Sequence, residues 1–183
     1  MRYHVRCAGG LGTGGWTVMH EGAAAPFTID DSRWRSARSF CVLDGRGGPP
    51  TEARLRATWR RRTLELYRGG ELEARISSSV LRQIRADFLG EMPGPDRLDL
   101  RGDFSEMNFR FVRGMTTVAV VSTVEGMGAD SWIEVRPCED HGLILAAALS
   151  VRQLCDRAWQ TRRSGRAPAG GRGTRVLERP IVG

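Results

Sequence analysis

The densest group of potential ligands in the sequence is a set of five arginines within nine residues: Arg54, Arg56, Arg60, Arg61 and Arg62. A guanidinium is planar and offers paired N–H donors, which match the geometry of a phosphate group. Alternate residues of a strand point to opposite faces. We therefore expect Arg54, Arg56 and Arg60 on one face and the apolar residues between them in the core. The cluster predicts a phosphate-binding surface carried by a strand.

A second interpretation of the same residues stays open. Charged side chains are common on exposed strand faces, where they also prevent association between sheets. Three acids lie close enough in the sequence to balance the arginines: Glu52, Glu65 and Glu73. On this interpretation the cluster is a solvated outer face without a ligand.

Potential metal ligands are sparse. Cys138-x-x-His141 supplies two possible zinc ligands, but structural zinc takes four, and no second pair has a suitable spacing. Asp99, Asp103 and Glu106 lie around a turn and lack the spacing of a calcium-binding loop. We therefore expect no metal site.

The sequence also lacks the patterns of catalysis and nucleotide binding. The glycine-rich segment GGLGTGG, residues 9–15, is not followed by the Lys-Ser or Lys-Thr pair of a phosphate-binding loop. The histidines are far apart and suggest no triad. The four cysteines form no CxxC pair, which favours free and mostly buried thiols. We predict a protein that is not an enzyme and that takes no cofactor.

The net charge of +7 is concentrated at the C-terminal end. From Arg157 onward there are seven arginines and one acid, whereas residues 1–156 hold 21 basic and 20 acidic residues. Residues 158–183 are rich in Arg, Gly and Pro without periodicity, so we expect a disordered basic tail after a domain at 1–157. The tail could contact nucleic acid by charge, but we expect no nucleic-acid binding by the domain itself.

Up to residue 136 the chain reads as short strands separated by Gly, Pro and Asp turns. About twelve strands are expected, at Tyr3–Cys7, Trp16–His20, Phe27–Asp30, Ser39–Leu43, Ala53–Trp59, Thr63–Arg68, Leu72–Ser77, Ala86–Glu91, Arg97–Arg101, Asn108–Arg113, Thr116–Val124 and Trp132–Arg136. Their regular spacing is typical of an antiparallel barrel or sandwich.

Two segments of this pattern resemble each other. ELYRGGELEARIS (65–77) and RFVRGMTTVAVVS (110–122) align without gaps at an offset of 45 residues. Arg68-Gly69 matches Arg113-Gly114 at the turn, and Ala74 matches Ala119 on the return strand. The alignment predicts an internally duplicated sheet.

The segment DHGLILAAALSVRQLC (140–155) has no polar face, which is the pattern of a helix buried on all sides. Glu139 and Asp140 favour its start, and Arg152 and Arg157 favour its end. Because the rest of the domain reads as strands, we expect the sheet to wrap around this helix. A barrel of about twelve strands is wide enough to need such a filling.

Five stretches together resemble the LURP-one-related family of tubby-like proteins, which is also similar to phospholipid scramblases: RYHVR (2–6), LELYRGGELEARIS (64–77), LDLRGDFSEMNFRFVRG (98–114), VAVVS (118–122) and WIEVRPCEDHGLILAAALSV (132–151). The resemblance covers roughly residues 1–157. It implies a closed antiparallel β-barrel around a hydrophobic C-terminal helix. It also implies binding of anionic phospholipid or phosphoinositide head groups through basic surface residues, which makes the five arginines the candidate ligands.

The sequence thus predicts a non-enzymatic binding module for anionic head groups at a membrane surface. The alternative is a scaffold that recruits a protein partner through its loops or basic tail. With no apolar signal segment and no run of about 20 apolar residues, we expect a cytoplasmic protein, at most peripheral to the inner face of the membrane.

Overall fold

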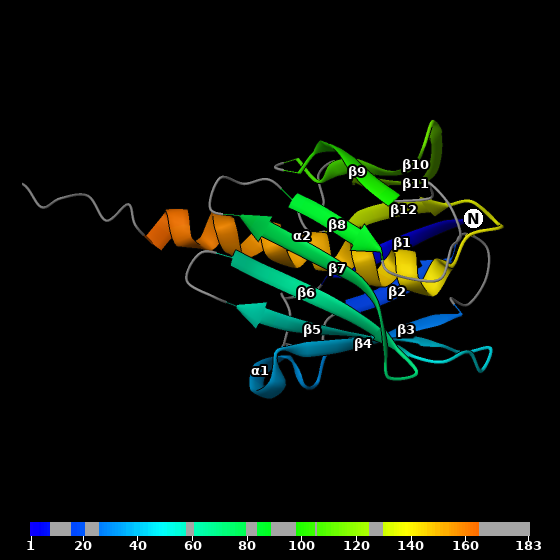
Figure 1. Ribbon diagram of the computed structural model, residues 1–183, viewed down its shortest axis with the longest axis horizontal. Helices are drawn as coiled ribbons and strands as arrows, with labels where there is room; N and C mark the ends of the chain where they lie inside the picture. Colours follow the sequence, from blue (N-terminus) through cyan, green and yellow to red (C-terminus); the bar gives the residue numbers. More distant parts are fainter. Residues whose placement is uncertain are drawn as a thin grey trace, which may run out of the picture.

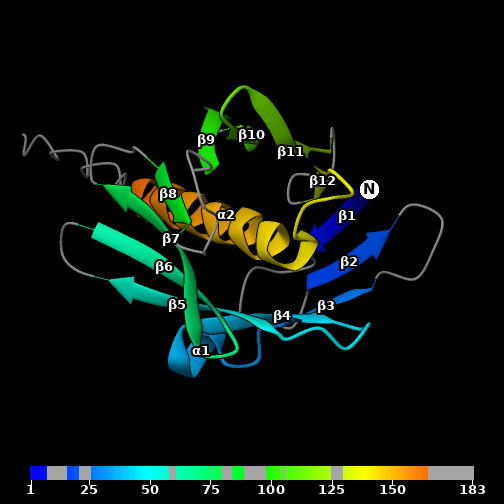
Figure 2. The same ribbon diagram turned by 45° about the vertical axis from the view of Figure 1, so that its right-hand side comes forward.

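The computed structural model describes residues 1–7, 16–20, 26–57, 61–79, 84–88, 98–104, 106–124 and 130–164. These residues form a mainly β structure, with two six-stranded antiparallel sheets and a long C-terminal helix, α2 (His141–Ser164), between them (Figures 1 and 2). The prediction of a mainly antiparallel β fold with a C-terminal helix is confirmed.

Sheet A has the strand order β2-β1-β12-β11-β10-β9. Its strands are β1 (Arg2–Cys7), β2 (Trp16–His20), β9 (Leu98–Asp103), β10 (Asn108–Arg113), β11 (Thr116–Thr123) and β12 (Ser131–Val135). Sheet B has the order β3-β4-β5-β6-β7-β8. Its strands are β3 (Phe27–Asp30), β4 (Ser39–Asp44), β5 (Thr51–Ala57), β6 (Arg61–Arg68), β7 (Glu71–Ser79) and β8 (Ile84–Phe88).

Two local elements differ from the sequence prediction. The one-turn helix α1 (Trp34–Ala37) precedes β4 and was not expected, because four residues are too few to show a helical period. Helix α2 was expected to end near residue 155 but continues to Ser164, seven residues into the predicted tail. Residues 165–183 lie outside the described part of the chain.

A closed barrel is not seen among the described residues. β2 lies against β3 and β8 lies against β9, but these pairs are not joined in one hydrogen-bonded ladder, so the β-structure consists of two sheets. The physical reason is that α2 is buried as long as apolar side chains surround it. This burial does not require the strands around the helix to be joined by hydrogen bonds in one continuous ring.

The core is built around α2. Residues 144–149 and 151 of the helix are at most 3% exposed, and Leu145 and Ala147 are fully buried. The inner faces of both sheets supply the surrounding side chains, including Tyr3 and Phe111 from sheet A and Leu64 from sheet B. The prediction that this apolar segment is a buried core helix is confirmed.

The two similar hairpins are equivalent in structure as well as in sequence. Leu66 pairs with Ala74 across β6 and β7, and Phe111 pairs with Ala119 across β10 and β11. The strand register then shifts at the same point in both hairpins, after Leu66 and after Phe111. The turn glycines, Gly69 and Gly114, have φ values of 57° and 58°, in the left-handed region that glycine adopts without strain. One copy lies in each sheet.

The matching arginines of the two hairpins bind adjacent acids at the start of α2. Arg113 donates two hydrogen bonds to the carboxylate of Glu139, at 2.8 and 2.9 Å. Arg68, at the equivalent position in sheet B, donates to Asp140. Asp140 in turn accepts a hydrogen bond from the Leu143 backbone N–H at 3.0 Å, which caps the helix. Each sheet is therefore attached by an ion pair to the same end of α2.

Replacing Leu145 by Asp is expected to unfold the domain. The variant would bury a carboxylate without a partner, at a cost of at least about 3–5 kcal/mol, a large part of the stability of an ordinary domain. Circular dichroism and thermal melting measure the effect. Met115→Asp is the control, since Met115 is 97% exposed and should keep its melting temperature. A folded Leu145→Asp variant would contradict the core assignment.

Replacing Arg113 by Met should lower the free energy of unfolding by about 1.5–3 kcal/mol, since it removes two charge-assisted bonds from a carboxylate whose side chain is only 8% exposed. Urea denaturation measures the loss. Arg110→Met is the control, because Arg110 is exposed on the same strand and should change stability by less than about 0.5 kcal/mol. Equal effects of the two substitutions would show that the Arg113–Glu139 pair does not anchor the helix.

Candidate functional site

Arg54 and Arg56 lie on the outer face of sheet B, where each is held by an acid. Arg54 donates from Nη2 to Glu52 at 2.6 Å, and its guanidinium lies 4.6 Å from the centre of the Tyr67 ring. Arg56 donates from Nε to Glu65 at 3.2 Å. The alternation along β5 (Thr51–Ala57) explains this face, because Ala53 before the two arginines is fully buried and Leu55 between them packs against the core.

Glu65 organises the arginines around it. It accepts hydrogen bonds from Arg56, from the Tyr67 hydroxyl at 2.8 Å and from Arg75 Nε at 3.4 Å. Burial raises the pKa of Glu65, but these hydrogen bonds and the charge of Arg56 outweigh it and bring the pKa below its ordinary value. Glu65 is therefore a carboxylate around neutral pH, and it fixes two guanidinium groups that remain 69% (Arg56) and 50% (Arg75) exposed.

The five arginines of the predicted cluster do not all lie on one face of sheet B. Arg54 and Arg56 share the outer face. Arg62 stands opposite Ala57 in the register and alternates with Leu64, so it belongs to the other face of the strand. Arg61 is the first residue of β6, opposite Ser79, and Arg60 lies outside the described residues.

Sequence reasoning missed four arginines near this surface. Arg75 joins Arg56 on Glu65 from the neighbouring strand β7. Arg33, Arg35 and Arg38 are exposed on and beside α1, which runs directly into β4. The segment SRWRSARS does show a high density of arginine, but it has no strand or helix period, and nothing local places it beside β5.

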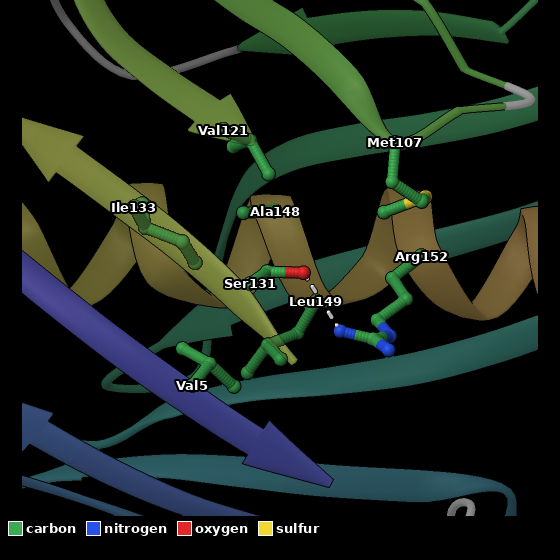
Figure 3. A pocket seen from close by; sticks show the side chains of 8 residues that line it. All are labelled: Val5, Met107, Val121, Ser131, Ile133, Ala148, Leu149 and Arg152. Carbon is green, nitrogen blue, oxygen red and sulfur yellow. Dashed lines mark hydrogen bonds between the residues drawn. The ribbon is translucent and has the colours of Figure 1, made fainter. Parts of the chain in front are cut away.

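A small cavity lies between α2 and sheet A, with a volume of about 10 Å³ (Figure 3). Arg152 projects from α2 at its edge and donates from Nη1 to Ser131 Oγ at 2.8 Å. Its guanidinium also lies 5.3 Å from the Trp16 ring. Arg152 was expected near the helix end, but the helix continues beyond it, and the residue is buried. The cavity holds one water molecule at most.

The predicted metal-ligand candidates have structural roles. His141 bonds to the Tyr3 hydroxyl through Nδ1 at 2.6 Å and to the Arg136 carbonyl through Nε2 at 3.0 Å, while Cys138 is exposed. These partners fit a neutral ring with the proton on Nε2, since the carbonyl can only accept. The described residues contain no cluster of three or more His, Cys, Asp or Glu suited to a metal ion.

Of the acids at 99–106, Asp99 and Asp103 belong to β9, and Glu106 follows the strand. Asp99 pairs with Arg101 at 3.8 Å, and Asp103 accepts a hydrogen bond from the Glu106 backbone N–H at 3.2 Å. Gly102 has a φ of 139°, and a side chain there would collide with the backbone of Asn108 and Phe109. Gly102 therefore allows β9 to lie close to β10, and the Asp103–Glu106 hydrogen bond follows directly at the end of the strand.

His141 makes the stability of the fold dependent on pH. Burial lowers the pKa of His141 from its ordinary value of 6.5, the chain's amino terminus and Arg46 lower it further, and the bond to the Arg136 carbonyl opposes them. Between the two pKa values the unfolded chain binds a proton that the folded chain does not. The free energy of unfolding should therefore fall as the pH drops below 6.5.

His141→Gln is expected to flatten this dependence, because glutamine keeps polar atoms near Tyr3 but does not titrate. Urea unfolding at a series of pH values on both sides of 6.5 would measure it for both proteins. His4 and His20 remain in both, so the difference between the curves isolates His141. If the free energy of unfolding changed with pH in the same way in both proteins, the His141 ring would make no contribution to the pH dependence.

Comparison with known proteins identified no relative of this chain. No protein-family model, no curated protein and no solved structure matches the chain. Within the described residues, no helix is long and apolar enough to cross a bilayer.

Proposed function

We propose that this protein is a non-enzymatic binding module for anionic phospholipid or phosphoinositide head groups, and that its outer arginines contact the phosphates. The observation that carries the proposal is the arrangement of Arg54, Arg56 and Arg75, which are held in place by Glu52 and Glu65 yet remain about half exposed or more. Arg61 from the adjacent strand, and Arg60 before it, are the further candidates from the predicted cluster, whereas Arg62 belongs to the other face of β6.

The ion pairs leave hydrogen-bonding capacity on these arginines. A guanidinium carries five N–H donors. Arg56 and Arg75 reach Glu65 through Nε, and Arg54 reaches Glu52 through one Nη group. The remaining Nη donors suit a phosphate, and the side chains lose little conformational entropy on binding because the acids already restrict them.

We also propose that the fold is a tubby-like barrel around α2. The two seams, between β2 and β3 and between β8 and β9, bring the edges of the sheets next to each other. On this proposal the barrel closes at these seams. The family resemblance of the sequence motifs supports the same architecture.

The filled interior favours a binding module over an enzyme. Small-molecule sites are usually pockets of roughly 300–1,000 Å³. Here α2 occupies the space between the sheets, and the cavity beside it measures about 10 Å³. On this proposal, binding takes place on the outer surface. The protein would act in the cytoplasm at the inner face of the membrane.

A protein-interaction scaffold is the second candidate. Met115 is 97% exposed at the tip of the β10–β11 hairpin, where an apolar side chain gains nothing from folding. This tip, or the basic segment after α2, would then contact a protein partner.

The test is vesicle flotation of the full chain with Arg54→Gln/Arg56→Gln. Each arginine near an anionic surface contributes about 1 kcal/mol, so the double variant should bind vesicles containing phosphoinositide roughly tenfold to thirtyfold more weakly. Arg101→Gln/Arg110→Gln is the matched control, because both residues are exposed neighbours on the outer face of sheet A. An equal loss of vesicle binding in the two double variants would show that the interaction depends only on the net charge of the protein.

A second variant separates the contribution of the C-terminal segment, in which Arg166, Arg172, Arg175 and Arg179 are replaced by Gln. The proposal expects this protein to keep its preference for phosphoinositide over neutral vesicles. If the C-terminal variant loses this preference and the Arg54→Gln/Arg56→Gln variant keeps it, the C-terminal segment binds the membrane and sheet B does not.

A further inference from the structure

The α1 segment presents arginines outward from a fixed position. Trp34, the first residue of α1, is 3% exposed, and its ring lies 6.1 Å from that of Phe40 in the core. Arg33, Arg35 and Arg38 around it are exposed. The buried indole thus anchors a one-turn helix whose charged side chains face solvent.

Backbone contacts place this segment next to Arg54. Ser39, the residue after Arg38, stands opposite Arg54 in the β4–β5 register. The Leu55 backbone N–H donates to the Arg38 carbonyl at 2.9 Å. Figures 1 and 2 both show α1 at the start of β4. The arginines of α1 and of β5 therefore lie on one continuous part of the surface, although the sequence separates them by about twenty residues.

Acids balance only part of the charge of this surface: Glu52 and Glu65 pair with the β5 arginines, and Asp30 lies close enough to Arg33 to interact with it electrostatically. Glu52 is held by Arg54, and the hydrogen bond from Arg54 is the main cause of its lowered pKa, to which Arg33 adds a smaller effect. Within the described part of the chain, neither Arg35 nor Arg38 forms an ion pair. Positive charge is therefore exposed over an area wider than a single phosphate.

We infer that the α1 arginines (Arg33, Arg35 and Arg38) and the β5 arginines (Arg54 and Arg56) together face the plane of an anionic membrane. The inference rests on the proposed function and extends it from a single head group to an orientation on the bilayer. The five exposed side chains are spread over α1 with its flanking residues and over β5, and exposed charge spread over two elements suits many lipid phosphates at once better than one enclosed ligand.

The aromatic residues of this surface favour lipid over single-stranded nucleic acid. Nucleic-acid strands gain much of their affinity from bases that stack on exposed aromatic rings. Here Trp34 is buried, and the guanidinium of Arg54 lies over the Tyr67 ring. The contacts available are therefore those of charge with phosphate.

The test compares a membrane with a soluble head group, using the full chain and Arg35→Gln/Arg38→Gln. The variant should bind phosphatidylcholine vesicles containing phosphatidylserine and phosphoinositide more weakly, by roughly fivefold for each arginine removed. Its affinity for inositol trisphosphate in solution, measured by calorimetry, should be unchanged. Arg101→Gln/Arg110→Gln again controls for net charge, and thermal melting confirms that α1 still docks.

The outcomes separate this inference from the proposed function. Unchanged vesicle binding in Arg35→Gln/Arg38→Gln, with a loss in Arg54→Gln/Arg56→Gln, would overturn the inference alone. An equal loss for vesicles and for inositol trisphosphate would place the α1 arginines in a single head-group site and also overturn it. If the native protein bound neither the vesicles nor inositol trisphosphate, the proposed function itself would be wrong. Release from vesicles by a short DNA duplex, but not by inositol trisphosphate, would assign the surface to nucleic acid.

Discussion

A helix that is apolar on nearly every side determines the rest of this structure. Such a helix is stable in water only when other elements cover its whole circumference. In this chain the covering elements are strands, so two sheets face each other across α2 (Figure 2). The apolar side chains of both sheets join those of the helix in one core. Between Leu143 and Cys155 the exceptions on the helix are Ser150, Arg152 and Gln153, and Arg152 is bonded to Ser131 inside the protein.

The duplicated hairpins explain how the helix is held in one position. An apolar contact surface by itself allows a helix to slide or rotate, because hydrophobic burial has little directionality. The two Arg–acid pairs are directional, and they come from equivalent positions in different sheets. Adjacent acids at the start of α2 receive them, so both sheets are fixed relative to the same turn of helix. The Tyr3–His141 bond adds a third attachment at this end, from β1.

The outer face of sheet B combines paired charges with guanidinium groups that stay partly exposed. Opposite charges alternate across neighbouring strands, with Glu65 between Arg54 and Arg75 in the register. Cross-strand pairs of this kind stabilise a sheet modestly. They also hold guanidinium groups in fixed directions while leaving part of each exposed to solvent. The two interpretations of the arginine cluster, a balanced outer face and a phosphate-binding surface, are therefore compatible with each other.

Local patterns in the sequence were sufficient for the strands, for the buried helix and for the similarity of the hairpins, because period-two alternation, an unbroken apolar segment and an Arg-Gly turn are properties of neighbouring residues. They also placed Arg54 and Arg56 on one face. The sequence could not place Arg62 on the other face of β6, since its direction depends on where the strand begins after the turn. Nor could it show that Arg68 and Arg113 meet Asp140 and Glu139, or that α1 lies beside β5. Those contacts join residues that are distant in the chain, and only the pairing of strands into two sheets around α2 brings them together.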